Sequence, residues 1–179
     1  MALPFMLALC LLLAACGGNP ESSPSDGGKK EPLAPVEVGD EYRDFTVTLT
    51  EGTEFTLSDH EGSVILLNFW ATWCGSCVRE MPAFPMLLEK YGEELTLLAV
   101  NAGEAEKTVK SFLEKNGYEF PVASDPDNEI NSLYPSEGIP YTVLIGRDGK
   151  IASIHLGADT ADAMYAAYCE EIDALLEEE

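Results

Sequence analysis

The most constraining feature of this chain is an apolar run that leads directly into a pair of cysteines. Residues 64–70 read Val-Ile-Leu-Leu-Asn-Phe-Trp, and Cys74-Gly75-Ser76-Cys77 follows shortly after. A short apolar run of this kind is typical of a buried strand. Two cysteines separated by two residues at the start of a helix can close a small disulfide ring. The pattern therefore predicts a dithiol where a buried strand passes into a helix.

The two cysteines are expected to differ in reactivity. At the first turn of a helix, unpaired N–H groups and the helix dipole stabilise a thiolate, which makes Cys74 the candidate nucleophile. Cys77 lies one helical turn further in, where the protein shields it. It is expected to resolve the mixed disulfide from within the protein.

A single pair of this spacing is also half of a zinc site. Structural zinc needs four ligands, usually from a second such pair or from two nearby histidines. The spacing favours redox chemistry, and we expect neither a metal nor another cofactor. The other cysteines and histidines are scattered along the chain: Cys10, Cys16, Cys169, His60 and His155.

Two stretches of the chain resemble a known family. Residues 68–82 read Asn-Phe-Trp-Ala-Thr-Trp-Cys-Gly-Ser-Cys-Val-Arg-Glu-Met-Pro and resemble the first motif of the extracytoplasmic thioredoxin-like proteins of the TlpA/ResA type. Residues 138–145 read Gly-Ile-Pro-Tyr-Thr-Val-Leu-Ile and, with Asp148-Gly149-Lys150, resemble the second motif. The motifs occur in the right order, and the likeness covers about residues 36–157. It implies a thioredoxin-like fold and thiol-disulfide oxidoreductase activity.

The apolar periodicity predicts one α/β domain over residues 36–179, with strands interleaved with helices. We expect a helix over 74–91 that is kinked at Pro82, because proline removes one backbone donor. The resemblance implies a central mixed sheet flanked by helices, an N-terminal hairpin, and an inserted helix and strand at 104–123. The other expected elements are a hairpin of strands 45–50 and 54–57, strand 95–101, helix 104–116, strand 120–123, a turn at 131–135, strands 142–145 and 151–156, and a helix over 158–176.

The first 35 residues are interpreted as a membrane anchor and linker. Residues 1–15 are uncharged and apolar, but shorter than the ~20 residues that a membrane-spanning helix needs, which is typical of a signal peptide core. A basic segment normally precedes such a core, and here no Lys or Arg occurs before Lys29. Leu13-Ala14-Ala15-Cys16 resembles the bacterial lipobox, which implies a lipid on Cys16. Residues 16–35 are poor in apolar residues and predict a flexible, lipid-anchored linker.

The charge of the chain disfavours nucleic acid as a partner. The formal net charge is −22, and it remains −22 without residues 1–15. The acidic residues near the C-terminus are interpreted as a solvated helix end. Together with the anchor, these features predict an extracytoplasmic protein on the outer face of a bacterial cell membrane.

Glu80 lies one turn beyond Cys77, on the same face of the expected helix. A partly buried carboxyl beside a thiol has a raised pKa and can accept the proton that Cys77 loses. The resemblance implies the same role for Glu80; the alternative is an ordinary exposed glutamate. Asn68 stands where thioredoxin itself keeps a buried Asp, and an asparagine cannot titrate.

The resemblance also implies a substrate-binding edge beside the dithiol. Pro140 would face Cys74, with a cis bond before it, and the backbone of Ile139 would pair with a substrate strand. Trp73 and Trp70 would shield the site, although Trp70 fits the core equally well. We expect Cys169 to behave as a small buried hydrophobe, and His60 and His155, which have no visible partners, are assigned no chemistry.

The leading interpretation is an enzyme that reduces disulfides in exported proteins. Because the outside of the cell is oxidising, such a reductant must be recharged. The resemblance implies an integral-membrane relay of the CcdA/DsbD type, and clients such as apocytochrome c or methionine sulfoxide reductase.

Other interpretations remain open on the same fold. The hydroxyl of Ser76 can stabilise the Cys74 thiolate, which would favour disulfide formation instead of reduction. A copper-binding chaperone of the Sco type would share the anchor and fold, but it spaces its cysteines by three residues and adds a histidine, for which only His155 is available. Peroxiredoxins carry a Pro-x-x-x-Thr-x-x-Cys motif, which residues 70–77 do not supply.

Overall fold

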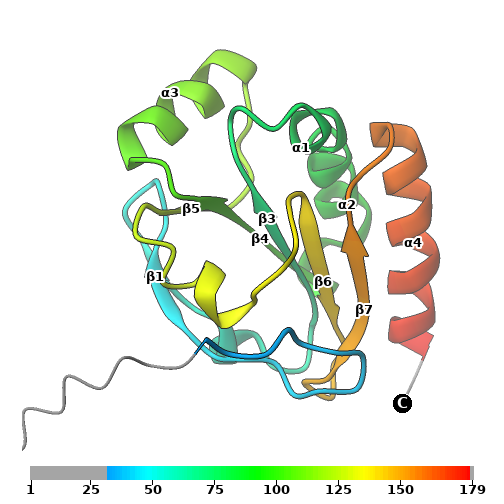
Figure 1. The fold of residues 1–179 in the computed structure, drawn as a ribbon. Coiled ribbons are helices and arrows are strands. Elements are labelled where there is room, and N and C mark those ends of the chain that lie inside the picture. Colours follow the sequence, from blue (N-terminus) through cyan, green and yellow to red (C-terminus); the bar gives the residue numbers. More distant parts are fainter. Residues whose placement is uncertain (1–31, 178–179) are drawn as a thin grey trace, which may run out of the picture. The chain divides into compact units, whose positions relative to one another are not determined.

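The computed structural model describes residues 32–177, which form a mixed sheet with helices packed against it (Figure 1). The sheet has five strands in the order β5-β4-β3-β6-β7. Its central strand β3 (Val64–Trp70) is parallel to β4 (Leu95–Ala102) and antiparallel to β6 (Tyr141–Ile145). At the edges, β5 (Val122–Asp125) is parallel to β4, and β7 (Ile151–Leu156) is antiparallel to β6. The predicted thioredoxin-like α/β fold is confirmed.

Four α-helices accompany the sheet in the described part of the chain. α1 (Gly75–Glu80) follows β3, and α2 (Ala83–Tyr91) follows α1 with only Met81 and Pro82 between them. The kink expected at Pro82 is therefore a break between two helices. α3 (Glu106–Asn116) ends at Gly117, which has φ 69°, a left-handed conformation that glycine adopts without strain. Figure 1 shows α4 (Ala161–Glu177) beside α2.

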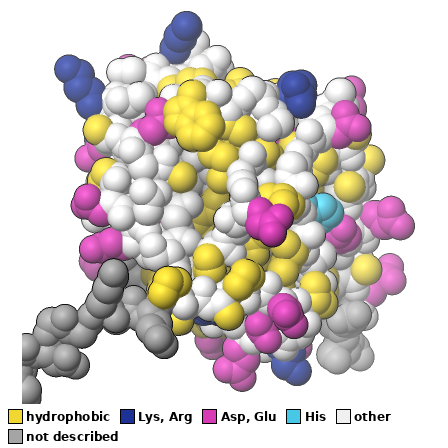
Figure 2. All heavy atoms as spheres, in the orientation of Figure 1, with side chains coloured by type: hydrophobic (Ala, Val, Ile, Leu, Met, Phe, Trp, Pro, Cys, Tyr) yellow, Lys and Arg dark blue, Asp and Glu magenta, His cyan; other side chains and the backbone are white. Residues whose placement is uncertain are grey.

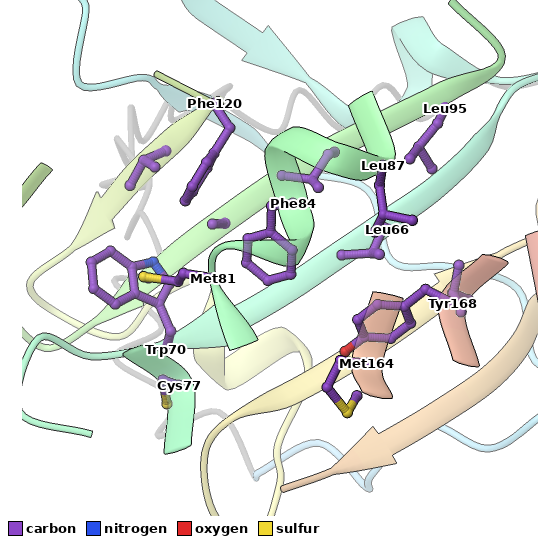
Figure 3. Packing of buried hydrophobic residues seen from close by; sticks show 14 of the residues in the cluster. Leu66, Trp70, Cys77, Met81, Phe84, Leu87, Leu95, Phe120, Met164 and Tyr168 are labelled. Atoms are coloured by element: carbon purple, nitrogen blue, oxygen red, sulfur yellow. The ribbon is translucent and has the colours of Figure 1, made fainter. Parts of the chain in front are cut away.

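Strand β3 is buried along its whole length because both faces of the sheet are covered. Leu66 and Trp70 point into the cluster formed with α1, α2, α3 and α4, part of which is drawn in Figure 3. Leu67 and Phe69 point to the opposite face. There the cover is the N-terminal hairpin of β1 (Thr46–Thr48) and β2 (Glu54–Thr56), the 3-10 turn η1 (Leu57–His60) and the segment around η3 (Asn131–Leu133). A second 3-10 turn, η2 (Gly92–Glu94), links α2 to β4.

Several element boundaries differ from the expectation by a few residues, and two of these differences have a clear local cause. The strand expected to begin at residue 120 begins at Val122, because Pro121 has no N–H to add to the ladder. The last helix begins at Ala161 and not at residue 158. Thr160 caps it, since its hydroxyl accepts from the N–H of Ala163 and its carbonyl accepts from the N–H of Met164.

Within residues 32–177, no helix combines the length and the apolar character that crossing a membrane requires. The predicted signal peptide and Cys16 lie outside the described residues, as does most of the predicted linker. The linker residue Ala34 accepts a hydrogen bond from the Arg43 guanidinium, and the side chain of Val36 is buried.

Candidate active site

The cysteine pair lies where β3 passes into α1. Cys74 is the N-cap residue of α1, and its sulfur accepts a hydrogen bond of 3.2 Å from the N–H of Cys77. The two cysteines are joined by a disulfide, with their Cα atoms 5.3 Å apart. Cys74 retains 7% of its surface, whereas Cys77 is fully buried. The accessible sulfur of the pair is therefore that of Cys74.

The Cys74 sulfur has two further neighbours. The Ser76 hydroxyl oxygen lies 3.5 Å from it, and the carbonyl oxygen of Ile139 lies 3.7 Å from it. The bond between Ile139 and Pro140 is cis, as the resemblance implies. Ile139 is half-buried and Pro140 is buried, so the segment before β6 forms one wall beside the reactive sulfur.

The two tryptophans near the pair have different environments. Trp73 precedes Cys74 directly and is 72% exposed. Trp70 is fully buried and packs against Phe112 with ring centroids 5.3 Å apart. Trp70 is therefore a core residue, as Figure 3 shows, and only Trp73 can contact a molecule that approaches the dithiol from solvent.

Glu80 ends α1 and is buried, with 1% of its surface exposed. Asn68 Nδ2 donates to Glu80 Oε1 over 3.0 Å, and the Tyr168 hydroxyl donates to Oε2 over 3.1 Å. Burial raises the pKa of Glu80 to about 7, because loss of water outweighs the lowering by these two donors. The alternative of an ordinary exposed glutamate is wrong, and the carboxyl can exchange a proton near neutral pH.

A second carboxylate, Glu104, holds the loop that carries the dithiol. Its two oxygens accept from the Thr72 N–H over 2.7 Å, from the Thr72 hydroxyl over 2.6 Å and from Asn101 Nδ2 over 2.9 Å. Partial burial raises the pKa of Glu104, but the three donors lower it more, so the net shift is downward. The carboxylate stays charged and fixes the segment before Cys74 to the end of β4.

Comparison with known proteins agrees with this geometry. The profile of the AhpC/TSA family matches residues 38–154. The thiol-disulfide oxidoreductase ResA of Bacillus thuringiensis (strain Al Hakam) is 36% identical over 130 residues, which are 72% of this chain and 75% of that protein.

The chain belongs to the AhpC/TSA family and, within it, is a thiol-disulfide oxidoreductase of the ResA type.

Solved structures support the same assignment. A crystal structure assigned as the thiol:disulfide interchange protein DsbE of Chlorobium tepidum is 35% identical, with a TM-score of 0.72, and covers 79% of this chain and 99% of that one. The exposed lipoprotein thioredoxin of Streptococcus pneumoniae strain TIGR4 is 28% identical, with a TM-score of 0.62, and covers 72% of this chain and 99% of that one.

Sequence reasoning missed Glu104 in this ResA-type oxidoreductase, although a signal was present. Glu104 lies two residues after the end of β4, which runs parallel to β3, so the ends of both strands meet at the same edge of the sheet. A polar residue placed after either strand is therefore positioned near the dithiol loop. Sequence reasoning also missed Tyr168 of α4, which donates to Glu80, and Thr142 of β6, which accepts from both Asn68 and Tyr168.

The histidines lie in hydrogen-bonded pairs, contrary to the expectation that they lack partners. His155 Nε2 lies 3.0 Å from Glu171 Oε2, and His60 Nδ1 lies 3.3 Å from the Thr96 hydroxyl. Among residues 32–177, no three His, Cys, Asp or Glu side chains are grouped closely enough to hold a metal ion.

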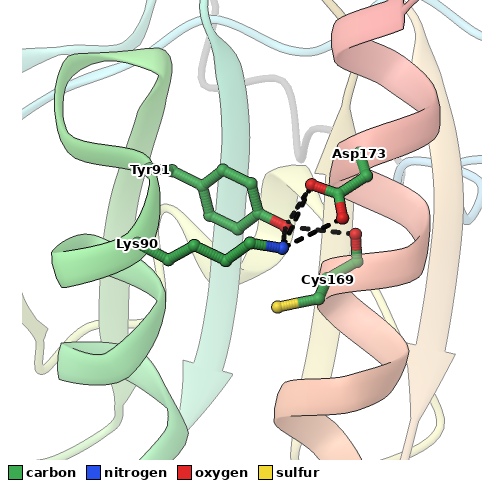
Figure 4. Close-up of polar contacts among 4 residues, drawn as sticks. All are labelled: Lys90, Tyr91, Cys169 and Asp173. Carbon is green, nitrogen blue, oxygen red and sulfur yellow. Dashed lines mark hydrogen bonds and ion pairs between the residues drawn. The ribbon is translucent and has the colours of Figure 1, made fainter.

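Cys169 lies on α4 in a polar contact between helices (Figure 4). Its thiol is free, and the side chain packs against the core as the expected small hydrophobe, although it is only half-buried. Its carbonyl oxygen accepts from the Tyr91 hydroxyl over 3.1 Å, and Lys90 forms an ion pair of 2.9 Å with Asp173 beside it. These groups join α2 to α4.

Proposed function

We propose that this oxidoreductase is a lipid-anchored, extracytoplasmic reductant of disulfides in exported proteins. The observation that carries the proposal is the asymmetry of the dithiol: Cys74 is accessible, Cys77 is sealed, and Glu80 is sealed one turn further along α1. An accessible nucleophile with a shielded partner is the arrangement that attacks an external disulfide and then releases it.

In the reducing direction, the reaction takes two successive thiol-disulfide exchanges. The Cys74 thiolate attacks one sulfur of the client disulfide, and the other client sulfur leaves as a thiolate. Cys77 then loses its proton to the Glu80 carboxylate and attacks Cys74, which releases the second client thiolate. The client gains two electrons, and the protein is left with the Cys74–Cys77 disulfide.

Client contact is assigned to the surface around Cys74. Trp73 supplies exposed apolar area, and Ile139 and Pro140 supply a backbone edge beside the sulfur. Figure 2 shows apolar side chains across one face of the molecule, with acidic side chains mostly around them. Apocytochrome c and methionine sulfoxide reductase are the proposed classes of client.

The weak support that the Cys74 sulfur receives favours the reducing direction. In the described part of the chain, its two donors are the Cys77 N–H and the Ser76 hydroxyl, and both are neutral. Neutral donors stabilise a thiolate less than charged ones do, and a less stabilised thiolate corresponds to a lower reduction potential. A reductant outside the cell must be recharged, for which we propose a membrane relay of the CcdA/DsbD class.

Disulfide formation is the second candidate, and the Ser76 contact favours it. A hydroxyl 3.5 Å from the Cys74 sulfur stabilises the thiolate and therefore the reduced form of the pair. Titration against glutathione separates the two candidates. A reductant has a potential nearer to about −270 mV than to about −120 mV, and growing cells hold its pair as thiols. A potential near the higher value, with the pair oxidised in cells, would establish the oxidant.

The roles of the cysteines are tested by trapping. Cys77→Ser is expected to accumulate mixed disulfides through Cys74, whereas Cys74→Ser accumulates none, as resolved on non-reducing gels. Equal alkylation of both thiols in the reduced protein at neutral pH would contradict this assignment.

The anchor is tested separately with Cys16→Ser. The proposal rests on the lipobox-like sequence and is supported by the likeness to the exposed lipoprotein thioredoxin of Streptococcus pneumoniae. The variant is expected to lose labelling by a radioactive fatty acid and to leave the membrane fraction. A wild-type protein that stays unlabelled in the cytoplasm would overturn the localisation.

A further inference from the structure

Glu80 belongs to a closed group of four polar side chains that come from four different elements. Asn68 is on β3, Glu80 on α1, Thr142 on β6 and Tyr168 on α4, and all four are buried. Asn68 Nδ2 donates to Glu80 Oε1 over 3.0 Å and to Thr142 Oγ1 over 2.8 Å. The Tyr168 hydroxyl lies 3.1 Å from Glu80 Oε2 and 3.1 Å from Thr142 Oγ1. Glu80 thus has a partner on each oxygen.

The protons of this group permit two arrangements. Tyr168 has one hydroxyl proton and two acceptors within reach, Glu80 and Thr142. When Glu80 is ionised, Tyr168 donates to its carboxylate. When Glu80 is protonated, the carboxyl can donate to the Tyr168 oxygen while Tyr168 donates to Thr142. The same four side chains therefore accommodate both states of Glu80 without leaving its oxygens unpaired.

The Tyr168 ring also lies close to titratable groups on the edge strand β7 and on its own helix, α4. The His155 ring of β7 meets the Tyr168 ring edge to face, with centroids 5.3 Å apart. His155 Nε2 lies 3.0 Å from Glu171 of α4. In the described residues, His155 and Glu171 are therefore the titratable groups around these four side chains, besides Glu80 itself and Cys77, which lies one turn earlier on α1.

We propose that Tyr168 is a positioning residue for proton transfer at Glu80, and that its hydroxyl, together with Asn68 and Thr142, holds the carboxyl in place and exchanges one hydrogen bond as the carboxyl changes state. The inference rests on the proposed role of Glu80 as the proton acceptor of Cys77. It assigns the C-terminal helix, which is remote from the cysteines in sequence, a function in the resolving step.

Removal of the Tyr168 hydroxyl has a defined direction of effect. The hydrogen bond from Tyr168 lowers the pKa of Glu80, so its loss raises that pKa further. Only ionised Glu80 can accept the proton of Cys77. The resolving step therefore shifts to higher pH and slows at pH 7.

The experiment measures release of a preformed mixed disulfide on Cys74 between pH 5.5 and 9 by stopped flow. Tyr168→Phe keeps the ring and removes the hydroxyl. The pH midpoint of its release rate is expected to rise by about one unit, which corresponds to the free energy of one hydrogen bond to a charged group. Tyr165→Phe is the matched control, because Tyr165 is on the same helix and is not one of the four side chains. Its profile is expected to match that of the wild type.

A direct titration of the Glu80 carboxyl by NMR in the reduced protein accompanies the kinetics and is expected to show the same upward shift in Tyr168→Phe. Thr142→Ser and Thr142→Val provide a second pair that differs in one hydroxyl. Serine should preserve the wild-type profile. Valine removes the acceptor that Tyr168 uses when Glu80 is protonated, so it should shift the profile downward, opposite to Tyr168→Phe.

The outcomes distinguish a failure of the Tyr168 role from a failure of the Glu80 role. If Glu80→Gln slows resolution while Tyr168→Phe and Thr142→Val match the wild type, the role of Tyr168 is overturned and that of Glu80 stands. If Glu80→Gln resolves at the wild-type rate, the proton-acceptor role itself fails.

Discussion

Glu80 and Glu104 both act on the dithiol segment, and their surroundings differ in two respects. Glu80 is sealed from water and receives two neutral donors, so its pKa rises to about 7. Glu104 is half-buried and receives three donors, including a backbone N–H, so its pKa falls. The balance of desolvation and donors therefore makes one carboxyl a group that exchanges protons near neutral pH and the other an anion at that pH.

The comparison teaches how one fold keeps two tasks apart. The exchanging carboxyl follows Cys77 in α1, where we propose that it accepts the proton of that thiol. The Glu104 carboxylate accepts two hydrogen bonds from Thr72, two residues before Cys74. Protonation of Glu104 would weaken these bonds and loosen the loop, so a lowered pKa suits this position.

The largest expected effect is that of Glu80→Gln on the resolving step. Loss of a positioned general base typically costs at least about 10²-fold, so release of the mixed disulfide at pH 7 should slow by about that factor. Attack by Cys74, measured in a Cys77→Ser background, should be unaffected. A variant that slows both steps equally would place Glu80 in a structural role and remove the contrast with Glu104.

Glu104→Ala should act on the fold of the loop rather than on proton transfer. It leaves the donors of Thr72 and Asn101 without their acceptor, and the expected loss is about 1–3 kcal/mol of unfolding free energy, measured by urea denaturation. Glu104→Gln keeps one acceptor oxygen and should lose less. Both variants should keep the pH midpoint of resolution, and a shifted midpoint would show that Glu104 takes part in the proton step.

The pH dependence of stability should differ in sign between the two carboxyls. The folded-state pKa of Glu80 is about 7, above the ordinary value of 4.5 for a glutamate in water, so the folded protein holds a proton that the unfolded chain has lost between these values. Wild-type stability should therefore decline relative to Glu80→Gln from about pH 4.5 to pH 7. Glu104 has a lowered pKa, so its contribution is present above its unfolded pKa and is lost as the pH falls through the folded value.

Thermal unfolding of the wild type, Glu80→Gln and Glu104→Gln between pH 3 and 8 tests these opposite trends. Parallel curves for the two variants would contradict the assigned difference between the carboxyls.

The smallest expected effect is that of Cys169→Ser. Cys169 is a half-buried free thiol beside Lys90 and Tyr91, remote in role from both carboxyls. Substitution should change the unfolding free energy by roughly 0.5 kcal/mol or less, as is usual for a position that is not in the core. Thiol-disulfide oxidoreductase activity and the pH profile of the resolving step should be unchanged. A changed profile would extend the titrating network beyond Glu80.

Local patterns predicted much of the fold. The apolar run before Cys74 is the central strand β3, and its full burial follows from helices on one face and the hairpin on the other. Two of the boundaries that differed depend on single groups, the missing N–H of Pro121 and the capping hydroxyl of Thr160.

The site was predictable where its residues are neighbours in sequence. Spacing along one helix placed Cys74, Cys77 and Glu80 together, but it did not show that Glu80 would be sealed. That burial depends on contacts between distant parts of the chain: Tyr168 of α4 donates to Glu80, and Thr142 of β6 accepts from Tyr168. Glu104 likewise reaches Thr72 because two parallel strands end side by side.

The contrast between Trp73 and Trp70 gives the protein a built-in optical reporter. Indole emission depends on the polarity around the ring, and the chain has two tryptophans, of which Trp73 lies in water and Trp70 lies in the core. A client that covers the surface beside Cys74 will move the Trp73 ring from water to an apolar contact, while Trp70 remains packed on Phe112. A blue shift on docking can therefore be attributed to one ring, and client association can be followed without an added dye.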